Sequence, residues 1–321
     1  MAKGWVKDWG AIIVLASIWG SSFILMKLGM QPGGYALSGE PGGNSTFTWS
    51  QVSSIRLASA MLFLLPFAIS TIPKVHKEDW KWISIVALCG NGIPAFLFTY
   101  AETGISSSLA GILNSLTPIF TLLVAVILFR MQWKAAHAIG ILLGMTGAIW
   151  MLLGGSGNVV GESKLGYALL VVLATILYAL SVNTTRHKLS HMSAIGIASM
   201  ALLITGIPAL ILLIFQKPWQ VVEMQGWEYS LAASLALGLF GTALAMLIWN
   251  GLVQRSGAVF ASSVTYLIPP VAMGWGSLSG EEIGIHIVLA MALILAGIAI
   301  INFSGPMKSG ETPCSVLEKR K

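Results

Sequence analysis

The feature that most constrains this chain is a series of ten apolar stretches, each long enough to cross a lipid bilayer. A helix needs about 20 mostly apolar residues to span roughly 30 Å of hydrocarbon. No water satisfies backbone groups there, so such stretches are expected to be helical. The sequence therefore predicts an all-α membrane protein with ten transmembrane helices. They are expected near residues 9–30, 47–70, 80–100, 104–129, 135–153, 165–185, 193–215, 229–251, 258–279 and 285–304.

Composition supports this class, because 56% of the residues are hydrophobic and only 9% are charged, an excess that no water-soluble domain needs. The 18 Lys and Arg indicate the orientation. Ten alternating crossings leave 14 of them on one side and 2 on the other, with Lys27 and Arg56 inside the membrane. The positive-inside rule then places both termini in the cytoplasm. This bias explains the net charge of +6, so no nucleic-acid partner is predicted.

The sequence also repeats itself. Residues 90–124 resemble residues 241–275 at an offset of 151, and residues 19–27 resemble residues 178–186 at an offset of 159. Five helices per repeat is an odd number, so the second repeat must enter the membrane from the opposite side. Such inverted halves can open a shared cavity to either face in turn, which favours a transporter. The expected division is 1–156 for the first repeat, 157–305 for the second and 306–321 for a disordered cytoplasmic tail.

Several motifs, taken in order, resemble the EamA family of the drug/metabolite transporter superfamily. They are Trp19-Gly20-Ser21-Ser22-Phe23 with Lys27, Arg56 within Ser54-Ile55-Arg56-Leu57-Ala58, Ser107-Ser108-Leu109-Ala110 to Leu116-Thr117-Pro118, and Pro269-Pro270 to Gly280-Glu281-Glu282. The polar loop at 31–46 departs from the compact family pattern and is either an external flap or a loop without a role. The resemblance implies a ten-helix bundle in a cytoplasmic membrane. The first four helices of each half would line a central cavity, and the fifth would brace the bundle or a dimer.

Those bracing helices would be 135–153 and 285–304. The first carries Gly140, Gly144 and Gly147, a stripe suited to close helix contact. The stripe could pack within one monomer or between two, so a monomer and a homodimer both remain open.

Two cations fall inside predicted spans, where charge is costly and usually marks function or a specific partner. Lys27 is near enough to the outer end of its span to reach the interface. Arg56 lies roughly nine residues inside, or about 13 Å at the helical rise per residue. Its planar fork suits a substrate carboxylate, and bonding to helix carbonyls is the structural alternative.

No Asp or Glu falls at mid-span, so a proton relay is not evident and uncoupled movement or exchange is favoured. Glu102, which closes the third span, is the best candidate for a proton site. Its alternative interpretation is a solvated loop carboxylate.

Polar and aromatic side chains in or near the spans are expected to face a cavity, because hydrogen-bonding groups in lipid are costly. Trp19 and Tyr178 are repeat equivalents, and so are Pro118 and Pro269, which are candidate hinges because proline interrupts helical hydrogen bonding. Tyr100 and Trp249 could instead anchor in the interface. The predicted cavity residues are Trp19, Ser22, Arg56, Asn91, Tyr100, Asn114, Tyr178, Asn183, Trp249 and Tyr266.

Enzyme motifs are absent from the sequence, and no cofactor, metal site or ATP-binding segment is predicted. The expected partners are a small-molecule substrate and the lipid bilayer. The residues themselves indicate a carrier of small, partly polar metabolites, and the resemblance implies export and points to amino acids and their derivatives. The alternatives are a carrier of drugs or sugar derivatives and, in a different class, a membrane scaffold or sensor without flux.

Overall fold

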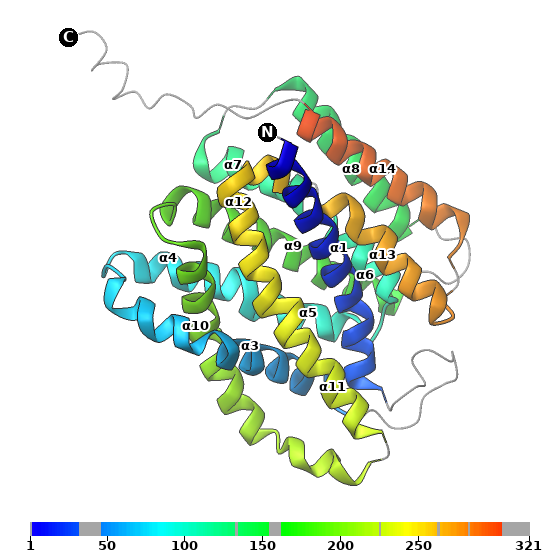
Figure 1. The fold of residues 1–321 in the computed structure, drawn as a ribbon. Coiled ribbons are helices and arrows are strands. Elements are labelled where there is room, and N and C mark those ends of the chain that lie inside the picture. The colour runs from blue at the N-terminus through cyan, green and yellow to red at the C-terminus, as the bar shows by residue number, and fades with distance from the viewer. Residues whose placement is uncertain are drawn as a thin grey trace, which may run out of the picture.

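The computed structural model describes residues 2–31, 46–131, 134–153, 162–224, 226–261, 264–281 and 283–303, and α-helices dominate all of these ranges (Figure 1). Seven helical segments are long and apolar enough to cross a membrane, and each corresponds to one predicted span. Their elements are α1 (Ala2–Met30), α3 (Trp49–Thr71), α4 to α5 (Asp79–Ala101), α6 and α7 (Ser107–Asn114 and Thr117–Phe129), α9 (Glu162–Lys188), α10 (Ala194–Phe215), and α11 to α12 (Trp227–Gly238 and Ala245–Ala261).

Three shorter apolar helices complete the set of ten, namely α8 (Ala135–Leu153), α13 (Val264–Leu278) and α14 (Ile285–Phe303). The prediction of an all-helical membrane protein with ten membrane helices is confirmed. In Figure 1, α1 begins and α14 ends at the same end of the bundle, as an even number of crossings requires. The polar loop at 31–46, apart from its two end residues, and the tail at 306–321 lie outside the described residues.

The helices pair as inverted repeats should. α1 packs against α13, and its counterpart in the second half, α9, packs against α7. The second helices of the two halves, α3 and α10, pack against each other, and so do the fifth helices, α8 and α14. Because each contact is matched by its symmetry equivalent, the two halves enclose a common interior.

Polar caps define where the membrane helices begin. Thr48 accepts a hydrogen bond from the Gln51 N–H, and the Gln51 side chain accepts one from the Thr48 N–H, which completes a capping box at α3. Ser106 and Ser193 cap α6 and α10 with their side chains alone, which accept from the N–H groups of Leu109 and Gly196. These short motifs satisfy N–H groups that would otherwise be left unpaired at the helix ends.

The glycine stripe of α8 packs within the monomer. A Cβ added at Gly140 would lie 2.5 Å from the carbonyl oxygen of Gly297 on α14, and one added at Gly147 would lie 2.9 Å from that of Ala290. The two backbones therefore touch where side chains would otherwise keep them apart. Figure 1 shows α8 and α14 side by side at the edge of the bundle, away from its centre.

Two π-helical turns interrupt equivalent positions of the two halves. The turn η2 (Leu88–Gly92) joins α4 to α5, and η4 (Leu239–Leu244) joins α11 to α12. The repeat offset of 151 superposes them. π-Turns are frequent at functional sites, because the extra residue disturbs the regular ladder and redirects side chains. Here each turn carries one polar residue that reaches the interior, Asn91 in η2 and Thr242 in η4.

Candidate functional site

The interior contains a cavity of about 490 Å³ between the two halves. Its described lining comes from the first four membrane helices of each repeat and includes nothing from α8 or α14. This distribution agrees with the expected division between lining and bracing helices. A cavity of this size accommodates a small organic solute.

One stripe of the wall comes from α1, where the lining residues are spaced by three, four and seven positions and so share one helical face. The repeat equivalents of all four, at an offset of 159, line the opposite wall from α9. The two sets are Trp19, Ser22, Phe23 and Met26 on α1, and Tyr178, Ser181, Val182 and Thr185 on α9.

A second symmetric set comes from the π-turns and the fourth helices. Gly90 and Asn91 line the cavity from η2, and their equivalents Gly241 and Thr242 line it from η4. Asn114 and its equivalent Thr265 line it as well. The amide Nδ2 of Asn91 is buried and has no hydrogen-bond partner among the described residues, so one amide donor of the wall is unused.

Arg56 brings a positive charge to this wall. Its Nε donates a hydrogen bond to the hydroxyl of Thr242 at 2.7 Å, and its Nη1 lies 4.0 Å from the sulfur of Met26. No ion pair between described residues includes Arg56. The π-turn thus holds one edge of the guanidinium, and the rest of the fork is left for water or an anionic group.

Aromatic rings supply much of the remaining surface. Trp19 and Trp249 both belong to the lining, and their ring centroids are 5.4 Å apart. Phe98 lies 5.9 Å from Phe23 and stacks on Tyr178 at the same distance. Phe23 and Phe98 are almost completely buried, so they close one end of the space. The arrangement suits a solute with an apolar body and a polar or anionic end.

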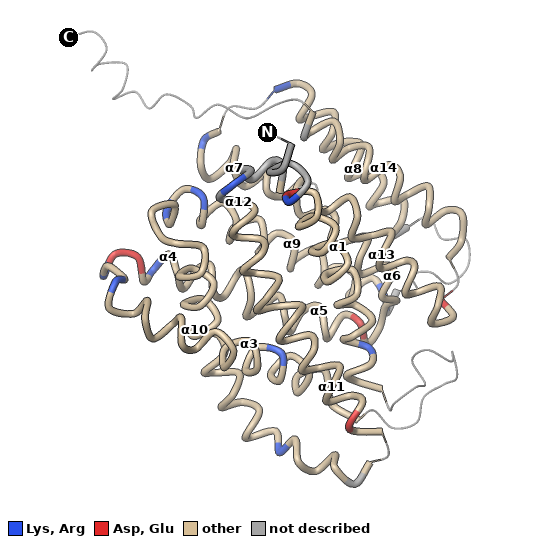
Figure 2. The backbone as a smooth tube through the Cα atoms, in the orientation of Figure 1, with Lys and Arg blue, Asp and Glu red and all other residues tan. Residues whose placement is uncertain are grey.

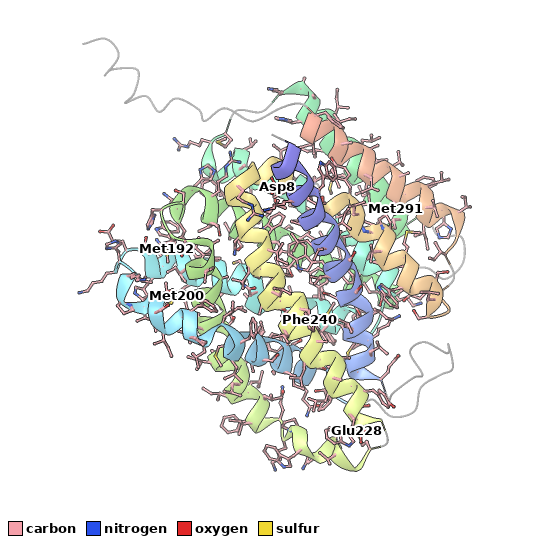
Figure 3. All side chains as sticks on the ribbon, in the orientation of Figure 1. Asp8, Met192, Met200, Glu228, Phe240 and Met291 are labelled. Carbon is pink, nitrogen blue, oxygen red and sulfur yellow. The ribbon has the colours of Figure 1, made fainter. Side chains whose placement is uncertain are left out.

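The cavity is open at the opposite end. Arg186 and Ser190, where α9 leads into α10, belong to its lining and are exposed. Figure 3 labels Met192 on this side of the molecule, far from Glu228 at the start of α11. The structure therefore shows a state that is accessible from the α9–α10 end.

Beyond the aromatic layer, the closed end is held by four residues that we call the latch: Lys27, Ser107, Ser108 and Glu281. The ammonium of Lys27 donates to Oε1 of Glu281 at 2.6 Å. Glu281 also accepts from the Ser107 N–H at 2.8 Å, the Ser108 N–H at 3.1 Å and the Ser108 hydroxyl at 2.6 Å. Lys27 is thus paired with a carboxylate of the second repeat, and its side chain is 20% exposed.

The latch joins the two repeats, since Lys27 and the serines belong to the first and Glu281 to the second. Burial alone would raise the pKa of the Glu281 carboxyl. The charge of Lys27 and the hydrogen bonds from Ser108 outweigh burial and hold the pKa below its usual range. The N-terminus of α6 favours the same ionised form.

Glu102 corrects one expectation. It follows directly after α5, yet its side chain is only 4% exposed, so the interpretation as a solvated loop carboxylate is wrong. Neither carboxyl oxygen has a hydrogen-bond partner among the described residues. Burial raises the pKa of the Glu102 carboxyl well above its usual range, because the charged form would be left without water.

Seven of the ten predicted cavity residues lie in the lining, and the structure does not bring the other three there. Tyr100 is 38% exposed and packs against Trp49 and Tyr167. Asn183 is turned away, because its amide donates to the carbonyls of Thr121 and Ala179 at 2.9 Å. Tyr266 directly follows Thr265 on α13, and of this neighbouring pair only Thr265 is in the lining.

The candidate hinges differ in setting. Pro118 lies in the first turn of α7, directly after the break that separates α6 from α7. Pro269 lies inside α13, which continues through it. The sequence did not predict Thr242 or the π-turns as part of the site. The signal available for Thr242 was its equivalence to Asn91.

We expect Asn183→Ala to destabilise the protein without abolishing function. The variant removes the hydrogen bond by which the Asn183 amide of α9 holds the Thr121 carbonyl of α7, and such a bond contributes about 0.5–1.5 kcal/mol. The thermal midpoint in detergent should fall, whereas Thr146→Ala, which removes an exposed hydroxyl bonded within its own helix, should leave it unchanged. Equal midpoints for both variants would contradict a bracing role.

The family model described as the EamA-like transporter family matches residues 9–153 and 165–303, and thus both halves. A solved crystal structure shares the fold with a TM-score of 0.59 at 16% identity, over 93% of this chain and 97% of that one.

Curated relatives are similar over nearly their whole lengths. An uncharacterised transporter of Archaeoglobus fulgidus is 23% identical over 92% of this chain and 99% of its own. An uncharacterised inner membrane transporter of Escherichia coli K12 is 25% identical over 91% and 90%. A protein of Streptantibioticus cattleyicolor, named a probable terminal-alkyne amino-acid exporter, is 24% identical over 91% and 92%.

Proposed function

Because this chain belongs to the EamA-like transporter family, we propose that it is a secondary transporter that exports amino acids or their derivatives by alternating access. It is a multi-pass membrane protein of a transporter family, not of an enzyme family. The finer proposal concerns the substrate, the direction and the mechanism.

The observation that carries the proposal is the cavity built from equivalent residues of both halves. Four positions of α1 and their four equivalents on α9 face one space, as do Asn91 with Thr242 and Asn114 with Thr265. A site at the interface of inverted repeats can be exposed to either side when the halves exchange conformations. A scaffold or sensor without flux would not need matched polar side chains in a cavity.

The chemistry of the wall favours an amino acid. The free edge of the Arg56 guanidinium suits a carboxylate, and the Trp19–Trp249 pair offers apolar surface to a side chain. The name of the Streptantibioticus relative points to the same class. A drug or sugar derivative would use the aromatic surface but would not need the cation.

The charge distribution supports export from a cytoplasmic-side opening. Figure 2 shows most Lys and Arg segments toward the end of the bundle where the chain begins and α7 ends. Arg186 at the open mouth belongs to this set. By the positive-inside rule this end faces the cytoplasm, in keeping with a bacterial inner membrane and cytoplasmic termini.

The test uses purified protein in liposomes loaded with a labelled amino-acid mixture, with efflux followed with and without a pH gradient. Selective efflux of a few amino acids is expected. Trp249→Ala should reduce it about tenfold, because an aromatic contact and its buried area are lost. Tyr229→Ala, a change on an exposed tyrosine outside the lining, should leave it unchanged. Absence of any amino-acid efflux would contradict the proposal and favour drugs or sugar derivatives.

A further inference from the structure

The closed end of the cavity contains a carboxyl group that the latch does not use. Glu102 is 4% exposed and neither of its oxygens has a hydrogen-bond partner among the described residues. The buried hydroxyl of Ser107 lies beside it and slightly favours the charged form, although its geometry falls short of a full hydrogen bond. Buried ionised groups are stable only when they are paired or hydrogen-bonded, so the structure accommodates this carboxyl in its neutral form.

The surroundings of Glu102 are those of the latch. Lys27 from α1 and Glu281 from the segment after α13 act on it electrostatically, as does Arg56 from α3 at longer range. Ser107 approaches from α6, and the ring of Tyr167 on α9 lies against the neighbouring Gly104. Among the described residues, these are the charged and titratable groups that act on Glu102.

The charge balance explains why Glu102 stays neutral here. Lys27 is already neutralised by Glu281, which three further donors hold in place. A second carboxylate beside this pair would be a like charge for Glu281 and would have no cation of its own. If the latch parts, however, water enters and Lys27 becomes available, so an ionised Glu102 gains both a solvent and a partner.

We propose that Glu102 holds a proton while the latch is closed and releases it to water when the latch opens, so that opening this end of the cavity costs the protein one proton. The step is a proton transfer from the Glu102 carboxyl to bulk water at the latch face. No electrons or other groups move. The inference rests on the proposed transport cycle, in which this end must open.

The opposite end of the cavity lacks this device. The repeat equivalent of Lys27 is Arg186, and continuing the 151-residue offset makes Arg130 the equivalent of Glu281 and Val253 that of Glu102. Two cations therefore stand where the closed end has an attractive pair. The part of any pH response that depends on Glu102 should accordingly appear at the latch face.

The direction in which pH changes the stability of the closed latch follows from proton linkage. The carboxyl has a higher pKa in the closed state than in the hydrated open state, so its contribution to closure is present below the open-state pKa and is lost as pH rises through the closed-state pKa. Between these two values the open population increases up to about tenfold per pH unit. Glu281 acts in the opposite sense. Because its pKa is lowered in the closed latch, Glu281 takes up a proton and weakens the latch only in acid.

The test measures access to the cavity and needs no substrate. Ser22→Cys is a nearly isosteric thiol on the cavity wall, to be used in a background in which Cys89 and Cys314 are alanine. A membrane-impermeant maleimide is added to one face of oriented vesicles at a time. Thr103→Cys near the latch and Ser190→Cys at the open mouth, both exposed, report which face is which.

From the latch face, labelling of Ser22→Cys should accelerate by up to about tenfold per pH unit as the pH rises toward the raised closed-state pKa of Glu102. Adding Glu102→Gln, which imitates the protonated form, should give slow labelling at every pH. Glu281→Gln should give fast labelling at every pH, because Lys27 loses its charged partner. From the open mouth, labelling should slow whenever the latch face opens, because the two ends open in turn, and Glu102→Gln should show no such slowing.

A flat pH profile in the parent protein, or a slope that persists in the Glu102→Gln variant, would overturn the proposal.

A second measurement does not depend on thiol labelling. The infrared difference spectrum of the unmodified protein should contain a protonated-carboxyl band at neutral pH that disappears in alkali, and Glu102→Gln should lack it. Absence of the band would overturn the proposal, whereas amino-acid flux without it would leave the proposed function intact.

Discussion

Replacing Arg56 with alanine is expected to reduce substrate efflux by about 10- to 150-fold while the protein remains folded and inserted. Hydrogen bonds to a charged group contribute about 1.5–3 kcal/mol, and about 1.4 kcal/mol corresponds to a factor of ten in rate. The estimate assumes that the free edge of the guanidinium binds the substrate carboxylate. The measurement is initial efflux from liposomes at matched protein content, together with substrate binding by calorimetry.

Two variants separate the effect of the Arg56 charge from the effect of its hydrogen bond to Thr242. Thr242→Val removes the hydroxyl that accepts from the Arg56 Nε but keeps the charge, so a smaller loss of a few-fold is expected. Arg56→Lys keeps the charge without the planar fork, so efflux should stay well below that of the parent protein. Unchanged efflux in a well-inserted Arg56→Ala variant would exclude a role in binding an anionic group.

Adding one methyl group at Gly297 is expected to destabilise the protein strongly. The new Cβ would lie 2.5 Å from the carbonyl oxygen of Gly140, 2.6 Å from the backbone nitrogen of Gly144 and 3.0 Å from its Cα. All three are backbone atoms that cannot rotate away, so α8 and α14 must separate. Overpacking of this kind costs about 1–3 kcal/mol, and Gly297→Ala should unfold at a lower temperature.

Gly274→Ala is the matched control, because a Cβ there meets nothing within 4 Å. The same chemical change should be neutral or stabilise helix α13 by up to about 1 kcal/mol. Thermal unfolding of both variants in one detergent provides the comparison. Equal midpoints would show that the α8–α14 contact does not depend on the absence of a side chain.

The helix count, the repeats and their inversion could be predicted because the bilayer leaves few alternatives to a long apolar helix. Both walls of the cavity could be predicted for a related reason. Polar residues such as Ser22, Asn91 and Asn114 must face the interior when lipid surrounds the bundle. The bracing helices followed from the family resemblance and from glycines such as Gly140.

The latch could not be predicted, because its partners are 254 residues apart in the sequence and only the fold brings Lys27 to Glu281. The burial of Glu102 could not be predicted for the same reason. A carboxylate just beyond an apolar span is expected in a solvated loop, and only the fold shows that neighbouring helices cover it. Asn183 was predicted to line the cavity, and the structure places it outside the lining. A polar residue in a span can satisfy neighbouring carbonyls as well as a substrate, and sequence alone does not separate these outcomes.

The central claim is that the two halves move the substrate through one cavity by opening its ends in turn. The most direct test joins Lys27→Cys to Glu281→Cys with a short, cleavable thiol linker, because these side chains meet across the closed end. Labelled amino-acid efflux should stop when the linker is attached and return when it is cleaved. In each single cysteine variant, treatment with the linker should leave the rate of efflux unchanged. Undiminished efflux with the closed end joined would contradict the account.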